Sequence, residues 1–275
     1  MGPLARTSRM LAAASLVAVV LASVGAGAAP AEPGARAPGG PRYTAGADGV
    51  GDPYFPLAGN GGYDVTHYDL DIDYAPPVAT VPPTPLAQVR GRLDGVATID
   101  LVATQDLDRF NLDLRGMTVS ALSINGKRAT EVEEPAGGVE VDGAAYWHVQ
   151  DDAARRWELT VQPRPKLKAG QTARVVVTYG GETTRPTDIE GALYGWVTTR
   201  DGAIVVSEPE GSMTWYPVSD HPRDKATYSF EITVPAGKTA VANGLPARDP
   251  VTADGETTWF WDATDQQASY LTTAS

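Results

Sequence analysis

The sequence predicts an all-β fold, built as an antiparallel β-sandwich or an open saddle-shaped sheet. Three observations support this prediction. Short segments alternate apolar and polar residues, Gly- and Pro-rich turns separate these segments, and no segment keeps a helical period beyond one or two turns. Alternation with a period of two is typical of a strand that buries one face, because successive side chains point to opposite sides of a sheet.

The first predicted strand, residues 65–74, has the clearest alternation. Its apolar face comprises Tyr68, Leu70, Ile72 and Tyr74, and its polar face comprises His67, Asp69, Asp71 and Asp73. The Pro-rich segment 75–85 follows and ends the strand, because proline cannot donate a hydrogen bond to a β ladder.

The next strands are predicted at residues 93–103, 109–114 and 119–124. The last of these runs into Asn125-Gly126, a strong signal for a type I′ hairpin, because both positions tolerate a positive φ. Turns are expected at 168–171 and 201–202. Further strands are predicted at 145–149, 157–161, 173–179, 192–198, 203–206, 227–234, 239–242 and 257–262.

The N-terminal 28 residues have the features of a signal peptide. Arg6 and Arg9 form a positive region, residues 11–24 form an uncharged apolar run, and Ala26-Gly27-Ala28 fits a signal-peptidase site. A membrane anchor is the alternative, but the apolar run is shorter than the roughly 20 residues that span a bilayer. We therefore expect a secreted, extracellular protein that has no membrane contact after cleavage of the signal.

The rest of the chain divides into two parts by composition. Residues 29–51 are rich in Ala, Pro and Gly, and we expect a disordered linker, because such a segment buries too little apolar surface to offset the entropy of ordering. Residues 52–268 carry the predicted strands and are long enough for one large β domain.

Charge and cysteine content exclude several classes of function. The chain has 22 Lys and Arg against 34 Asp and Glu, a formal net charge of −12, and an acidic surface repels the phosphate backbone of nucleic acids. No cysteine is present, so a thiol nucleophile, a disulfide and a cysteine-based metal site are all excluded.

The histidines give little support for a metal or hydrolytic site. His67, His148 and His221 are far apart in the sequence, and we expect surface or hydrogen-bonded side chains rather than zinc ligands. Ser219, Asp220 and His221 are adjacent, whereas hydrolytic triads are assembled from distant segments, so we do not expect a triad. We therefore expect the chain to have no metal site and no cofactor of its own.

Four tryptophans leave a carbohydrate platform open as an alternative. Aromatic side chains in a β domain more often belong to the core or to an interface. We therefore favour a core or interface position for these residues, which are Trp196, Trp215, Trp259 and Trp261.

The order of several motifs resembles the N-terminal domain of the aminopeptidase N family of zinc metallopeptidases, the gluzincin aminopeptidases related to leukotriene A hydrolase. Residues 63–74 and 91–95 resemble the opening hairpin of that domain, and 193–196 resembles its Gly-aromatic strand. The motifs that continue the likeness are Arg174–Gly181, which ends in Tyr-Gly-Gly, Tyr216–Pro222, Lys225–Thr227, Ala242-Asn243-Gly244 and Ser269-Tyr270-Leu271.

Two departures indicate a divergent branch of the family. The segment Tyr216–Pro222 matches the family's Phe-Pro-x-x-Asp-Glu-Pro motif, but His221 stands where that motif has Glu. Ser212-Met213 stand where the family has Ala-Arg before the motif. The function of these side chains, including any role of His221, therefore does not follow from the resemblance.

The resemblance implies a secreted bacterial zinc aminopeptidase that removes N-terminal residues from peptides. The family binds zinc through His-Glu-x-x-His on a helix, with the Glu as general base, and this motif does not occur in the chain. We expect residues 269–275 to begin a missing catalytic domain, the chain to be a truncated fragment, and the fragment alone to be inactive. The alternative is a free-standing secreted β-sandwich module that binds peptide or carbohydrate.

The resemblance also implies one substrate-binding residue. Glu208 aligns with the family's Gln or Glu that contacts the free α-amino group of the substrate, and a carboxylate suits an ammonium partner. Glu210 is the nearby alternative for this contact. A further alternative is that both residues are ordinary acids on a loop and bind no substrate. We expect Asp220 and Lys225 to stabilise the turn rather than to bind substrate.

Overall fold

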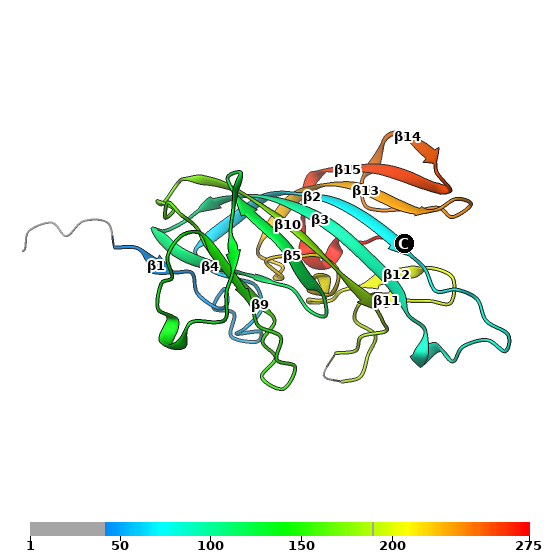
Figure 1. Cartoon of the computed structure of the whole chain (residues 1–275), viewed down its shortest axis with the longest axis horizontal. Helices are drawn as coiled ribbons and strands as arrows, with labels where there is room; N and C mark the ends of the chain where they lie inside the picture. Colours follow the sequence, from blue (N-terminus) through cyan, green and yellow to red (C-terminus); the bar gives the residue numbers. More distant parts are fainter. Residues whose placement is uncertain (1–41, 189) are drawn as a thin grey trace, which may run out of the picture. The chain divides into compact units, whose positions relative to one another are not determined.

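A large mixed sheet dominates the fold (Figure 1). The computed structural model describes residues 42–188 and 190–275, and in this part the large sheet has eight strands. All neighbouring strands are antiparallel except β13 and β2, which are parallel. The strands, in spatial order, are β14 (Leu245–Ala253), β15 (Glu256–Ala268), β13 (Lys225–Pro235), β2 (Tyr63–Ala75), β3 (Gly91–Ala103), β10 (Thr172–Thr183), β5 (Thr118–Ile124) and β6 (Lys127–Arg128).

Two smaller sheets complete the described part. The five-stranded sheet has the order β1 (Thr44–Ala45), β4 (Leu107–Asp113), β9 (Glu158–Gln162), β8 (Ala145–His148) and β7 (Thr130–Glu131). The two-stranded sheet consists of β11 (Gly195–Thr198) and β12 (Ala203–Val206). Short 3-10 turns lie between strands: η1 (Leu86–Gln88), η2 (Ala136–Gly138), η3 (Ser212–Thr214) and η4 (Ser269–Leu271).

The described residues include no helix that is long and apolar enough to cross a membrane.

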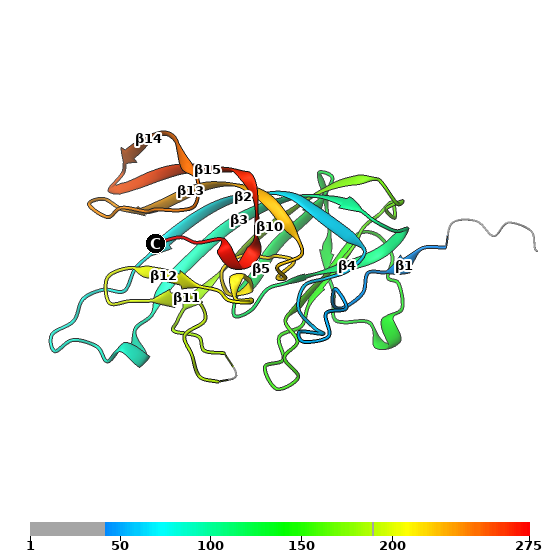
Figure 2. The ribbon, with the colours of Figure 1, turned by 180° about the vertical axis from the view of Figure 1, so that it is seen from behind.

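The segment around η3, drawn in yellow, lies against one face of the large sheet (Figure 2). An aromatic cluster joins the two. Tyr68 of β2 stacks on Tyr228 of β13 with ring centroids 5.0 Å apart, and Tyr68 also meets the edge of Tyr216. Tyr216 in turn packs against Trp215 at 4.5 Å. These side chains are almost fully buried, so the turn that follows η3 is held by the core of the large sheet.

The all-β class is confirmed, and most predicted strands lie within one to four residues of the observed ones. The hairpin at Asn125-Gly126 is confirmed, since both residues have positive φ between β5 and β6. The strand predicted at 239–242 is wrong, because only Ala242 forms a bridge there, to Ala274. Strand β14 was not predicted, because all of its residues are exposed and show no apolar alternation.

The N-terminal predictions fall mostly outside the described residues, including the signal peptide at 1–28. Within the predicted linker, however, Thr44–Ala45 form β1 beside β4, and Asp48 accepts a hydrogen bond from Asn111 Nδ2 at 2.9 Å. The end of the predicted linker is therefore ordered, because its backbone pairs with the edge of the five-stranded sheet.

Residues 269–275, expected to begin another domain, pack onto the β domain itself. The Ser269 hydroxyl donates to buried Asp220, and Ala274 pairs with Ala242. Ser275 and Val241 exchange two backbone hydrogen bonds, so the last residues of the chain form part of the same packed unit.

Candidate functional site

Both candidate acids, Glu208 and Glu210, lie on the loop that connects β12 to η3. The fully buried carboxylate of Asp220 stabilises this loop, because its Oδ2 accepts hydrogen bonds from the backbone N–H groups of Gly211 at 2.8 Å and Met213 at 3.0 Å. Without this acceptor, two buried N–H groups would lack a partner.

Asp220 is itself held by two other elements. Its Oδ1 accepts the Ser269 hydroxyl of η4 at 2.8 Å, and its backbone N–H donates to Asp113 Oδ2 at the end of β4 at 2.7 Å. Burial raises the pKa of the Asp220 carboxyl, and the hydrogen bonds from Gly211, Met213 and Ser269 act in the opposite direction. The expected structural role of Asp220 agrees with this geometry.

The loop also requires glycine where it passes β11. Gly211 has a φ of 141°, and a Cβ there would lie 3.0 Å from the backbone nitrogen of Gly195 and from the Ser207 hydroxyl. Gly195 has a φ of 67°, and a Cβ there would overlap the hydroxyl of Thr214. The two backbones therefore approach as closely as only glycine allows.

Glu208 is exposed on this loop, and the described residues give its carboxylate no hydrogen-bond or ion-pair partner. A carboxylate held on a fixed backbone with its oxygens open to solvent can accept hydrogen bonds from a cationic ligand. The structure therefore leaves Glu208 available for the contact that the sequence predicts, and it does not test that contact.

Glu210 lies in a different environment. Its side chain is only 14% exposed and pairs with Arg155 Nη2 at 3.1 Å. Burial raises the pKa of the Glu210 carboxyl, nearby Asp220 raises it further, and Arg155 lowers it. Because Glu210 already has a cationic partner, it is less available to a ligand than Glu208.

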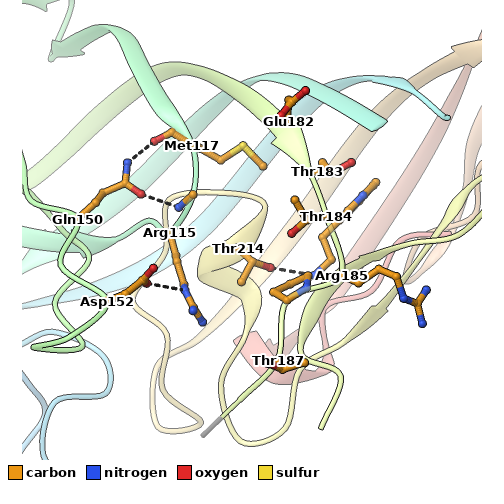
Figure 3. A pocket seen from close by; sticks show the side chains of 13 residues that line it. Arg115, Met117, Gln150, Asp152, Glu182, Thr183, Thr184, Arg185, Thr187 and Thr214 are labelled. Carbon is orange, nitrogen blue, oxygen red and sulfur yellow. Dashed lines mark hydrogen bonds and ion pairs between the residues drawn. The ribbon is translucent and has the colours of Figure 1, made fainter. Parts of the chain in front are cut away.

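A polar pocket of about 390 Å³ lies close to this loop (Figure 3). Its walls come from the β4–β5 turn, the β8–β9 turn, the end of β10 and the segment after it, and Trp196 and Thr214 beside the loop. Gln150 fixes one wall, because its Oε1 accepts from Gly116 N–H at 2.6 Å and its Nε2 donates to Met117 O at 2.8 Å.

The three histidines lie apart and are each held locally. His67 contacts the hydroxyls of Thr227 and Ser229, and His148 contacts the Leu114 carbonyl at 2.8 Å. Within the two described ranges, no group of three or more His, Cys, Asp or Glu side chains is placed to hold a metal ion. The described residues therefore do not fit a zinc site.

His221 is buried, and its Nδ1 accepts the Arg223 backbone N–H at 3.1 Å while Nε2 lies 3.5 Å from Asp52. The His221 backbone N–H donates to the Ser219 carbonyl at 3.0 Å, but in the described part no side-chain hydrogen bond joins His221 to Ser219 or Asp220, so these neighbours do not form a triad.

The tryptophans do not form an open platform. Trp196 and Trp215 are buried and pack against each other with ring centroids 5.6 Å apart. Trp259 and Trp261 are partly buried and pack against the core. The core interpretation is therefore confirmed for the first pair and agrees with the packing of the second.

Sequence reasoning missed a pair of buried acids behind the loop. Asp113 and Glu158 are paired across β4 and β9, and both are largely buried. Burial and the neighbouring Glu158 raise the pKa of Asp113 well above its ordinary value, and burial, followed by nearby Asp48, raises the pKa of Glu158 to about 8. The alternation of β4 predicts only its apolar face, so the sequence held no signal that these acids meet.

Solved structures of M1 zinc metallopeptidases share this fold. The M1 zinc metallopeptidase from Deinococcus radiodurans matches with a TM-score of 0.66 and 28% identity, over 82% of this chain and 44% of that one. A mutant of the Deinococcus radiodurans protein bound to a Tyr-Ser-Ala substrate matches with a TM-score of 0.65 and 29% identity, over 82% and 45%. A two-domain M1 zinc metallopeptidase mutant bound to L-arginine gives 0.65 and 28%, over 82% and 45%.

The described β sheets therefore define a domain of the M1 zinc metallopeptidase class. Residues 65–271 match the Peptidase M1 N-terminal domain, and the chain belongs to that family. The chain spans less than half the length of the solved structures that it matches. No curated protein sequence matches it.

Proposed function

We propose that this chain is the N-terminal, substrate-cleft-forming domain of a secreted zinc metallo-aminopeptidase that removes N-terminal residues from peptides. Membership of the M1 N-terminal family and the likeness to a peptide-bound relative support the proposal. The zinc ligands would come from a catalytic domain that binds this one, since the described residues form no metal site. Secretion rests on the signal-peptide features of residues 1–28.

The observation that carries the proposal is the exposed carboxylate of Glu208 on a loop fixed by Asp220. The free amino end of a peptide is an ammonium group, and a carboxylate on a rigid backbone can hold it by charge-assisted hydrogen bonds. Holding that end fixes the position of the first peptide bond relative to the catalytic domain. In this interpretation Glu208 binds and orients substrate but takes no part in proton transfer.

The coding sequence beyond Ser275 gives the first test. We expect an in-frame His-Glu-x-x-His motif in the next domain, because that motif supplies two imidazoles on one helical face. An unrelated sequence there would favour the free-standing binding module instead.

The kinetics of the complete enzyme test Glu208 directly. We expect Glu208→Ala to lower kcat/KM on unblocked peptides by about 10- to 100-fold, because a charge-assisted hydrogen bond to the substrate amine is lost. Glu208→Gln, which keeps an acceptor oxygen, should lose less.

Glu256→Ala is the matched control, because Glu256 is exposed at the start of β15. Equal kinetics for the wild type and Glu208→Ala would remove Glu208 from the substrate site.

A further inference from the structure

We propose that the pocket beside Arg115 binds a carboxylate group, as at the C-terminal end of a short peptide. The pocket has a volume of about 390 Å³, within the range of small-molecule sites, and Trp196 is among its lining residues. Arg115 and Gln150 form other parts of its wall (Figure 3). The proposal goes beyond the amine contact of Glu208, and its test needs no zinc and no catalytic domain.

Arg115 is held in place before any ligand arrives. Its backbone N–H donates to the Met213 carbonyl at 2.7 Å, and its guanidinium lies over the Trp157 ring at 4.4 Å and near the Tyr194 ring at 5.9 Å. A planar guanidinium fixed by stacking loses little entropy when it forms two parallel hydrogen bonds to a carboxylate.

The outer nitrogens of this guanidinium are available. Its Nε forms an ion pair with Asp152 Oδ1 at 3.3 Å, and the described residues offer no hydrogen-bond acceptor to Nη1 or Nη2. A carboxylate can therefore approach the edge that carries the Nη atoms without displacing a protein partner.

Trp196 also lines the pocket, and its ring packs against Trp215 in the core with centroids 5.6 Å apart. This part of the wall is therefore fixed before a ligand binds. The wall formed by Gln150 adds no competing donor, because its amide is already bonded at both ends.

The charges of the pocket favour a monoanion over a dianion. Arg115 and Arg185 are balanced by Asp152 and Glu182 among the lining residues. A dianionic phosphate would meet both acids, whereas a carboxylate carries one charge and matches a single planar guanidinium. Arg185 is already engaged, since its Nη1 donates to the Thr198 carbonyl at 2.8 Å, which leaves Arg115 as the available cation.

Calorimetric titration of the purified chain with small blocked peptides tests the proposal. The probes are N-acetyl-Gly-Ala, its C-terminal amide, and an N-acetylglutamyl amide whose only carboxylate is on the side chain. We expect saturable binding of N-acetyl-Gly-Ala and about tenfold weaker binding of its amide, the loss expected for a charge-assisted hydrogen bond. Binding of the side-chain acid alone would support the carboxylate site and identify the side chain as its source.

Three variants, one of them a control, connect the binding to Arg115. Arg115→Gln should weaken binding of the free acid by about tenfold, whereas Arg128→Gln, the same charge change on the exposed strand β6, should leave it unchanged. Asp152→Asn removes the acid next to Arg115 and should tighten binding by about threefold, a gain that misfolding cannot produce.

Three results would overturn the proposal. They are the absence of saturable binding of any probe, saturable binding of N-acetyl-Gly-Ala and its amide with equal affinity, and equal loss of affinity in Arg115→Gln and Arg128→Gln.

Discussion

At the scale of single residues, Asp220 connects elements that are distant in the sequence. Its carboxylate accepts hydrogen bonds from Gly211 just before η3, from Met213 in η3 and from Ser269 in η4, and its N–H donates to Asp113 of β4. One buried carboxylate therefore fixes the backbone on which the exposed Glu208 stands, so the binding role proposed for Glu208 depends on the structural role of Asp220.

We predict that Asp220→Ala lowers the free energy of unfolding by about 3 kcal/mol, because two buried backbone donors lose their acceptor. Asp220→Asn should cost less, since its amide oxygen can still face Gly211 and Met213. Urea denaturation followed by tryptophan fluorescence measures both. Asp249→Ala, on the exposed strand β14, is the control, and a loss no larger than that of the control would contradict the prediction.

The sequence predicted the role of some single residues and not of others. Asp220 was expected to stabilise its turn by hydrogen bonds, and its side chain forms them with Gly211, Met213 and Ser269. Arg115, Arg155 and Tyr194 were not found, because they lie on separate turns and meet only after the three sheets have packed. Local patterns carry no information on such contacts.

At the scale of elements, predictability follows burial. Strand β2 alternates buried and exposed residues along most of its length and was predicted, whereas β14 is exposed throughout and was not. Strand β14 exists because β15 offers its edge, and Pro246 and Pro250 interrupt the ladder between the two strands. The parallel pairing of β13 with β2 is equally invisible in an alternation pattern, because both strands bury one face whichever way they run.

Alanine substitutions at two turn glycines distinguish the cost of a positive φ from the cost of steric overlap. Gly126 has a φ of 75° and open space around a Cβ, so Gly126→Ala should cost about 1 kcal/mol. Gly244 has a φ of 93°, and a Cβ there would overlap the backbone of Asp262 and Ala263, so Gly244→Ala should cost about 3 kcal/mol. Chemical denaturation of the two variants checks the order, and equal losses would show that overlap adds nothing to strain at Gly244.

At the scale of the whole molecule, acidity dominates. The net charge is −12, and several acids are buried rather than solvated. Burial raises the pKa of Asp113, Asp220 and Glu210, that of Asp224 to about 6 and that of Glu158 to about 8. Each of these groups retains a proton in the folded state at pH values where the unfolded chain has released it.

We therefore predict that the protein is more stable at pH 5.5 than at pH 8. Stability falls as pH rises wherever the folded state binds more protons, which for Glu158 covers the range from 4.5 in the unfolded chain to about 8. Below that range stability instead falls as pH falls, because three acids have a lowered pKa in the folded state. Their pKa is lowered by hydrogen bonds from basic side chains: Arg174 to Asp100, Arg156 to Glu134 and Lys166 to Glu140. Thermal unfolding between pH 4 and 9 should show a maximum Tm in the mildly acidic range.

Glu158→Gln assigns part of this pH dependence to one group. The amide cannot release a proton, so the variant should lose less stability than the wild type between pH 5.5 and 8, by up to about 1.4 kcal/mol per pH unit. Glu256→Gln, at an exposed position, should follow the wild type. High salt distinguishes the contribution of surface charge from that of buried carboxyls, because salt screens repulsion among surface acids and leaves buried carboxyls largely unaffected. A Glu158→Gln profile parallel to that of the wild type would show that this buried carboxyl does not control the acid preference, and the surface charge would then account for it.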